Sequence, residues 1–178
     1  NQELDAKEVP NRLLNTSHAF HSFMMEPILE DFRKELEKIK LNIPRLPIIS
    51  TATGTWLTDT EATDPTYWVN QLKNTVHFAD AMDTAFELGD FILLEVGPGQ
   101  TLITLARQQA AGKIIPAFPS ITLPKEEEYN EYTTLLTALG ELWMRGINPD
   151  WKAFYGQQQR QKIELPNYIF DRKLCWIE

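Results

Sequence analysis

Two histidines, His18 and His21, lie three residues apart in the segment Thr16–Ser22, directly before a strongly patterned helical segment. A histidine in this place can serve as a general base, because imidazole exchanges its proton near neutral pH. His21 comes just before the expected helix, whose positive dipole end favours the neutral ring that a base requires. From these residues alone, the favoured interpretation is that both histidines are structural and partly buried, and the general base is the alternative.

No residue of the chain has the surroundings of a catalytic nucleophile. The serines are Ser17, Ser22, Ser50 and Ser120, and none lies in the Gly-x-Ser-x-Gly sequence of a nucleophile elbow. Cys175 lacks glycine-rich neighbours of the kind that surround a nucleophile, and it is interpreted as structural. We therefore expect the chain to be part of a catalytic domain whose nucleophile lies elsewhere.

A metal site is not predicted. A zinc site needs at least three protein ligands, and His77 and the single cysteine are far from the histidine pair in sequence.

Composition restricts the class of protein further. The chain has 178 residues and a formal net charge of −8, which argues against nucleic acid or an anionic membrane as the main partner. It has one cysteine, no signal peptide and no apolar run of the roughly 20 residues that a membrane helix needs. We expect a cytoplasmic protein, and the start without methionine suggests a segment of a longer chain.

Apolar spacing and turn residues predict alternating helices and strands. Helices are expected at 25–39 (ended by Asn42 and Pro44), at 64–72, from 78 to an end at Gly89, and at 101–111. Strands are expected at 9–14, 46–50, 91–96 and 113–118. The run 91–96 is nearly all apolar, as in a strand that is covered on both faces. The order strand, turn, helix, strand between 91 and 118 predicts an α/β fold with a parallel sheet.

The glycine-rich segment 95–100 has two interpretations. It could bind phosphate, but it lacks the lysine and hydroxyl residue of a P-loop and the spacing of a dinucleotide-binding motif. A tight strand-to-helix turn is the favoured interpretation, and such a turn can still border a ligand site.

The character of the chain changes after Phe118. A helix is expected to end at Gly146, with its apolar face formed by Leu135, Leu136, Leu139, Leu142 and Trp143. Residues 150–178 are rich in aromatic side chains without a clear period, and we expect an extended segment that packs its rings on another surface.

Several short motifs follow one another over nearly the whole chain. They are Ser17–Ser22, Met25–Pro27, Asp64–Val69, Val76–Asp80, Leu94–Gly99, Leu139–Trp143 and Leu165–Phe170. No single motif is decisive, but in this order they resemble the acyltransferase domain of type I modular polyketide synthases, which is related to malonyl-CoA:acyl-carrier-protein transacylases.

This resemblance implies an α/β-hydrolase-like subdomain with an inserted ferredoxin-like subdomain. Residues 1–16 would then end the small ferredoxin-like subdomain, and residues 17–118 would form the C-terminal part of the catalytic subdomain. Residues 119–178 would be the linker that follows the domain and packs back on it.

The resemblance also implies a reaction and its residues. A serine takes an acyl group from coenzyme A and passes it to the phosphopantetheine thiol of an acyl carrier protein. His21 matches the catalytic base, and Gln71 matches the residue whose backbone carbonyl orients it, although by sequence alone Gln71 is an ordinary exposed side chain. His18 and Phe20 match substrate-binding positions, and the form His-Ala-Phe-His resembles malonyl-selective domains. A phenyl ring leaves no room for a methyl branch, and such overpacking costs about 1–3 kcal/mol.

The family's nucleophilic serine and its carboxylate-binding arginine have no match in this chain, and both are expected upstream of residue 1. The expected partners are the N-terminal remainder of the domain, the ketosynthase domain with its linker, and the acyl carrier protein. Malonyl-CoA is the expected substrate, and no cofactor is expected to bind this chain. Two alternatives stay open: a stand-alone transacylase of fatty acid synthesis, and a non-catalytic remnant that only docks an acyltransferase.

Overall fold

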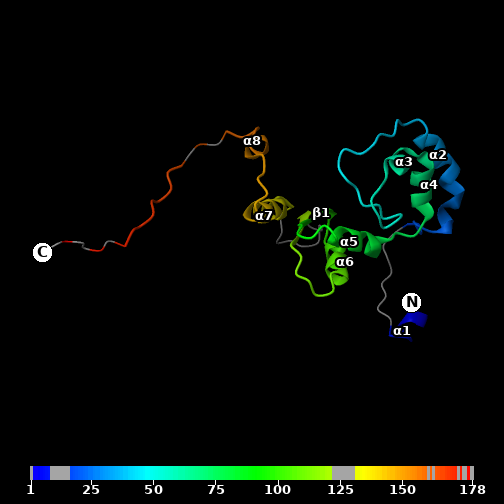
Figure 1. Cartoon of the computed structure of the whole chain (residues 1–178), viewed down its shortest axis with the longest axis horizontal. Helices are drawn as coiled ribbons and strands as arrows, with labels where there is room; N and C mark the ends of the chain where they lie inside the picture. The colour runs from blue at the N-terminus through cyan, green and yellow to red at the C-terminus, as the bar shows by residue number, and fades with distance from the viewer. Residues whose placement is uncertain are drawn as a thin grey trace.

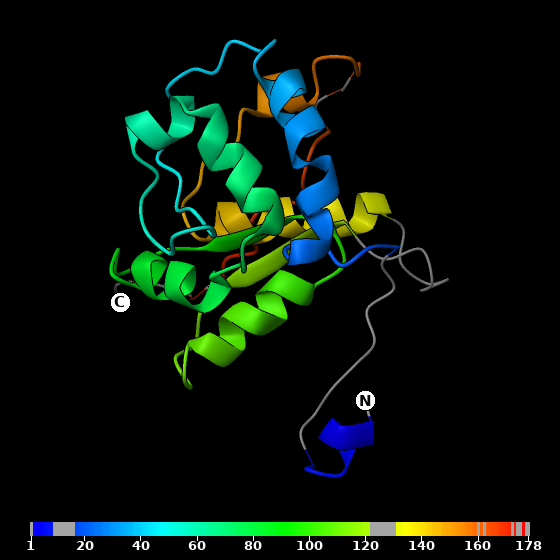
Figure 2. The ribbon, with the colours of Figure 1, turned by 90° about the vertical axis from the view of Figure 1, so that its right-hand side faces the viewer.

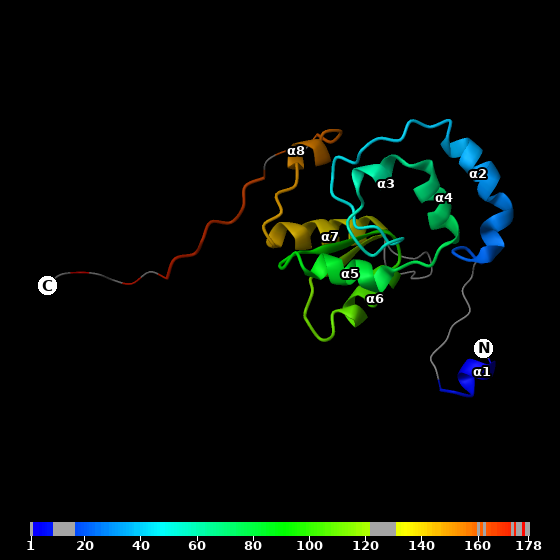
Figure 3. The same ribbon diagram turned by 45° about the vertical axis from the view of Figure 1, so that its right-hand side comes forward.

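The computed structural model describes residues 2–8, 17–121, 131–159, 161, 163–171, 173 and 176. Helices α2, α3 and α4 form one group, and the two strands lie beside α5, α6 and α7 (Figures 1 and 3). Helix α1 (Gln2–Asp5) lies apart from these groups at the N-terminal end (Figure 2). Two groups of helices around a small sheet agree with the predicted α/β class.

The sheet consists of two parallel strands, β1 (Leu93–Pro98) and β2 (Ala117–Ile121). Helix α6 (Thr101–Gln109) connects them and packs against both, which makes a β-α-β unit. The predicted parallel sheet is therefore confirmed, although both strands begin later than expected. The prediction that β1 is covered on both faces was wrong for the described residues. Half-buried and exposed positions alternate along the strand, and Val96 is 83% exposed.

The turn between β1 and α6 favours the tight-turn interpretation of the segment 95–100. Gly99 has a φ of +96°, a conformation that glycine adopts without steric cost. The carboxylate of Glu95 accepts hydrogen bonds from the backbone N–H groups of Leu102 at 3.2 Å and Ile103 at 3.0 Å. A side chain of the protein thus occupies the N-terminus of α6, where a phosphate would have to bind.

Helix α4 (Pro65–Lys73) lies where its end signals predict it, and α5 (Phe78–Phe86) begins as predicted but ends before Gly89. Asp64 is the N-cap of α4, and its side chain accepts the N–H of Thr66 at 2.8 Å. Pro65 occupies the first helical position, where no N–H is needed.

The single helix expected at 25–39 was wrong. The structure has a 3-10 helix, η1 (Phe23–Ile28), followed by the α-helix α2 (Leu29–Leu36). Pro27 lies inside η1 and has no N–H with which to continue an α-helical ladder. The chain therefore starts this segment with the tighter i→i+3 bonds, as from Met25 N–H to the Ser22 carbonyl at 3.1 Å.

The strand expected at 46–50 was also wrong, because Ile49 and Trp56 form only an isolated antiparallel bridge. Helix α3 (Asp59–Thr63) was not predicted, although the capping box of Thr58 and Glu61 signals its start. Hydrogen bonds from the backbone and side chain of Thr58 hold the pKa of Glu61 below its usual range.

The turn after Ser50 requires glycine at position 54. Gly54 has a φ of +76°, and a Cβ atom placed there would lie 2.5 Å from the Cβ of Asp80 on α5. We expect Gly54→Ala to lower the free energy of unfolding by about 2–4 kcal/mol, because backbone strain and a steric clash act together. Urea denaturation of the chain measures this loss.

Gly89→Ala is the matched control for this prediction. Gly89 has a φ of +82°, but nothing lies within 4 Å of the position of its Cβ atom. The free energy of unfolding of Gly89→Ala should therefore fall by only about 1–2 kcal/mol, from backbone strain alone. Equal losses for the two variants would show that the contact between the turn and α5 is unimportant.

Helix α7 (Glu131–Met144) packs against β2, and its predicted face is covered only in part, since Leu139 and Leu142 are half-buried. Thr134 and Ala138 are buried, whereas Leu135, Leu136 and Trp143 are exposed. Small side chains allow the helix to approach the strand closely, so that the bulky ones point elsewhere. Helix α8 (Trp151–Phe154) was not predicted, because a helix of a single turn carries no apolar period.

Beyond α8, the described residues have no regular secondary structure and extend away from the rest of the chain (Figures 1 and 3). The rings of Tyr168, Phe170 and Trp176 are exposed, so their packing on another surface stays a prediction. The strand expected at 9–14 and Cys175 lie outside the described residues. Among the described residues, no helix combines the length and the apolar character needed to cross a bilayer.

The division into residues 1–16, 17–118 and 119–178 also stays a prediction. Strand β2 continues to Ile121, past the expected boundary at 118, and α7 packs on that strand.

Candidate active site

The imidazole of His21 is held by the end of α4. Its Nδ1 atom lies 3.0 Å from the backbone carbonyl oxygen of Gln71 and 3.2 Å from that of Asn74, which are 50 and 53 residues away. A carbonyl oxygen can only accept a hydrogen bond, so Nδ1 carries the proton. In the neutral ring Nε2 then keeps its lone pair, which is the arrangement that a general base requires.

The backbone of His21 is tied to the same turn. Its N–H donates to the carbonyl of Leu72 at 3.0 Å, and its φ of +58° lies in the left-handed region. The last carbonyls of a helix have no partners within the helix and carry its negative dipole end. The end of α4 therefore accepts two N–H groups of His21, one from the backbone and one from the ring.

Beside His21 is an open, largely apolar groove of about 450 Å³ between α2 and α4. Its lining residues are His21, Phe32, Leu36, Leu41, Trp68, Gln71 and Leu72. Helix α2 is attached to the start of α4 by a hydrogen bond from Arg33 to the Thr66 hydroxyl at 3.1 Å. The groove is thus formed by two helices that are bonded to each other, and one of them, α4, holds the His21 ring.

His18 and Phe20 lie in the same short segment as His21. The Nδ1 of His18 is 2.9 Å from the Ser17 hydroxyl, and the His18 ring meets the ring of Phe20 edge-on at a centroid distance of 6.3 Å. Phe20 is 51% exposed. Half of Phe20 is therefore not covered by other residues of this chain. Any substrate pocket that Phe20 lines must be completed by residues from outside this chain.

The structure thus brings together the predicted pair His21 and Gln71, and it adds Asn74, which the sequence did not indicate. Asn74 is the C-cap of α4 and has an extended backbone, with φ −77° and ψ 155°. Asparagine favours helix ends, because its side chain competes for the backbone hydrogen bonds of a helix. Whether the Asn74 carbonyl meets His21 depends on where the segment 17–22 packs. No local signal in the sequence indicates that position.

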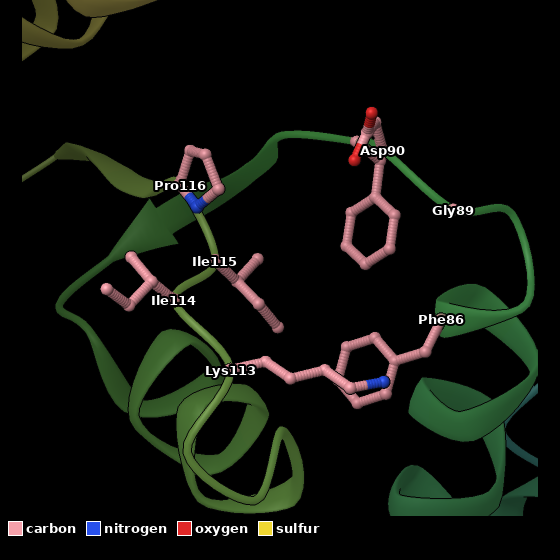
Figure 4. A pocket seen from close by; sticks show the side chains of 8 residues that line it. Phe86, Gly89, Asp90, Lys113, Ile114, Ile115 and Pro116 are labelled. Carbon is pink, nitrogen blue, oxygen red and sulfur yellow. The ribbon is translucent and has the colours of Figure 1, made fainter.

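A second cavity lies at the amino ends of the two strands. Its volume is about 280 Å³, and it is lined by Phe86, Gly89, Asp90, Phe91 and residues 113–116. Figure 4 shows the Lys113 side chain extending toward Phe86 from the loop before β2. Ligand sites of parallel sheets lie at the carboxyl ends of the strands, so we assign no catalytic role to this cavity.

Within the described ranges, no three side chains of His, Cys, Asp or Glu gather closely enough to hold a metal ion.

Comparison with known proteins shows the family to which the chain belongs. A family model described as "Acyl transferase domain" matches residues 2–149. A phenolphthiocerol/phthiocerol polyketide synthase protein of Mycobacterium tuberculosis is 32% identical over 177 residues, which are 99% of this chain and 12% of that protein. Polyketide synthase GfsB of Streptomyces halstedii is 35% identical over 167 residues, 94% of this chain and 3% of that protein.

Solved structures of acyltransferase domains are similar to this chain as well. The acyl transferase domain of SpnD, in complex with 2-(pent-4-yn-1-yl)malonyl, has a TM-score of 0.76 and 36% identity over 82% of this chain and 35% of that one. The acyltransferase domain from the second module of the salinomycin polyketide synthase has a TM-score of 0.77 and 32% identity, covering 93% of this chain and 38% of that one.

The chain therefore spans little more than a third of these solved domains and a much smaller part of the synthases. The matched residues include the segment of His21 and the end of α4 that holds its ring. With the family match over most of its length, this chain belongs to the acyl transferase domain family, and the sequences most similar to it here are polyketide synthases.

Proposed function

We propose that this chain forms the base-bearing part of a polyketide synthase acyltransferase domain. The domain would transfer a malonyl extender unit from malonyl-CoA, through a serine acyl-enzyme, to the phosphopantetheine thiol of an acyl carrier protein. The observation that carries the proposal is the hydrogen bonding of His21 Nδ1 to the carbonyls of Gln71 and Asn74. This bonding leaves Nε2 as the proton acceptor.

In the first half-reaction, Nε2 of His21 takes the hydroxyl proton of the serine as the serine oxygen attacks the thioester carbon. The carbon–sulfur bond breaks, and the departing thiolate of coenzyme A receives that proton from the imidazolium. In the second half-reaction His21 takes the proton of the phosphopantetheine thiol as its sulfur attacks the ester carbon. A new carbon–sulfur bond forms, the acyl–oxygen bond breaks, and the serine oxygen receives the proton from the imidazolium.

The carbonyls at the end of α4 have two effects in these steps. They keep the ring in one orientation, and their partial negative charge stabilises the imidazolium that forms transiently. In a Ser-His-Asp triad a carboxylate has this role. The serine and the arginine that would bind the malonyl carboxylate are assigned to the remainder of the domain.

For the acyl group, we assign malonyl rather than methylmalonyl on the basis of the side-chain volume of Phe20. His18 meets the Phe20 ring edge-on and is assigned to the same substrate-binding segment. The related SpnD domain was solved in complex with a substituted malonyl group, 2-(pent-4-yn-1-yl)malonyl.

The proposed partners follow from the multidomain polyketide synthases to which the chain is similar. They are the remainder of the same domain, the ketosynthase domain with its linker, and the acyl carrier protein. The exposed aromatic residues after α8 are assigned to contacts with the first two. A cytoplasmic location agrees with the single cysteine.

The 178-residue chain provides a direct test of the proposed division of the site. Incubated alone with malonyl-CoA, it should gain no covalent malonyl group, because it supplies the base without the nucleophile. The complete domain should gain one malonyl group under the same conditions, as measured by intact-protein mass spectrometry. A malonyl adduct on the isolated chain would contradict the proposal.

A further inference from the structure

The hydroxyl of Ser22 closes the turn in which His21 lies. Its Oγ atom donates to the carbonyl of Ala19 at 2.6 Å and accepts the N–H of Met24 at 3.3 Å. These two partners lie on opposite sides of His21 in the chain. One hydroxyl therefore joins the segment before the candidate base to the helix η1 that follows it.

The turn needs this support because His21 has an unfavourable backbone conformation. A φ of +58° in a residue other than glycine costs about 1–2 kcal/mol and persists only where the surroundings hold it. On one side, the carbonyls of Gln71, Leu72 and Asn74 hold the ring and the backbone N–H of His21. On the other side, Ser22 holds the residues next to it.

We infer that Ser22 is a positioning residue that keeps His21 in the orientation needed for proton transfer. This inference rests on the proposed function, and it assigns Ser22 no contact with the reacting atoms. As a simple N-cap of η1, Ser22 would need only the bond to Met24 N–H. The shorter bond to Ala19 does not cap the helix, and instead fixes the segment that carries His18 and Phe20.

The kinetic test uses Ser22→Ala and Ser22→Thr in the complete domain. Without the hydroxyl, His21 should leave its orientation for part of the time, so kcat for self-acylation should fall about tenfold while KM for malonyl-CoA stays constant. Ser22→Thr should restore kcat, because the extended backbone of Ser22, with φ −145° and ψ 171°, suits a β-branched residue.

Thr137→Ala is the matched control. It removes an exposed hydroxyl on α7 that bonds a backbone carbonyl at 2.8 Å, and it should leave kcat unchanged. A kcat of Ser22→Ala within twofold of the wild type would overturn the inference. It would also be overturned if Ser22→Thr failed to restore kcat, or if the loss only followed the folded fraction.

A second measurement does not depend on activity. In nitrogen-15 histidine NMR spectra of the 178-residue chain, the Nδ1 proton of His21 should be protected from exchange, with its signal assigned by its loss in His21→Ala. Ser22→Ala should speed that exchange about tenfold and Ser22→Thr should not; equal protection in Ser22→Ala would refute the positioning role. If the wild-type complete domain formed no acyl-enzyme, the proposed function would fail, and this spectrum would still decide the role of Ser22.

Discussion

His21→Ala in the complete domain should slow self-acylation from malonyl-CoA by about 10²–10⁴-fold, the usual contribution of a general base. The physical reason is the loss of the acceptor for the serine proton, because no other described side chain takes the place of the ring against the carbonyls of Gln71 and Asn74. Single-turnover loading, followed by mass spectrometry, measures the rate.

His77→Ala is the control for this substitution. The Nδ1 of His77 pairs with the carboxylate of Asp80 at 3.0 Å, and the ring is partly exposed at the start of α5. We expect loading within twofold of the wild type. Unchanged loading in His21→Ala would reject the assignment of the base, while a large loss in both variants would indicate a general effect on folding.

Phe20→Ser should shift the choice of extender unit toward methylmalonyl-CoA. If the phenyl ring excludes the methyl branch by its volume, removing it should recover about 1–3 kcal/mol, which is a change of roughly 5–150-fold in the loading ratio. Competition between the two coenzyme A thioesters, with the acyl-enzymes quantified by mass, measures that ratio.

Phe23→Ser provides the comparison for Phe20→Ser. Phe23 is three residues away from Phe20 and 78% exposed. Its substitution therefore removes a phenyl ring close in sequence but leaves in place the Phe20 ring that is assigned to the substrate pocket. Its loading ratio should equal that of the wild type. The volume argument fails if Phe20→Ser leaves the ratio unchanged, or if Phe23→Ser changes it equally.

Elements with strong local signals were predicted best. Asp64 and Pro65 define the start of α4 through a side-chain cap and a fixed φ, and both effects act within one turn of chain. The glycine-rich turn after β1 was predicted for the same reason. The parallel pairing followed from a strand, helix, strand order that leaves few topologies.

Predictions failed where packing between distant segments decided the outcome. The exposed leucines of α7 formed the more apolar stripe, yet the small residues Thr134 and Ala138 face β2. Pro27 indicates a helix start by its position, but here it lies inside a 3-10 helix that packs on α4. The spacing of residues along the sequence does not indicate how one helix or strand packs against another.

The sequence by itself determined the residue types of the candidate site, its family resemblance and the order of the helices and strands from α4 to β2. These features depend on side-chain chemistry and on hydrogen bonds within a few residues. The resemblance implied the carbonyl of Gln71, but only the tertiary structure decided that the carbonyl of Asn74 joins it at one nitrogen of His21, across 50 and 53 residues. Backbone carbonyls are the same in every residue, so their role depends on direction alone, and that direction is set where the segment of His21 packs against the end of α4.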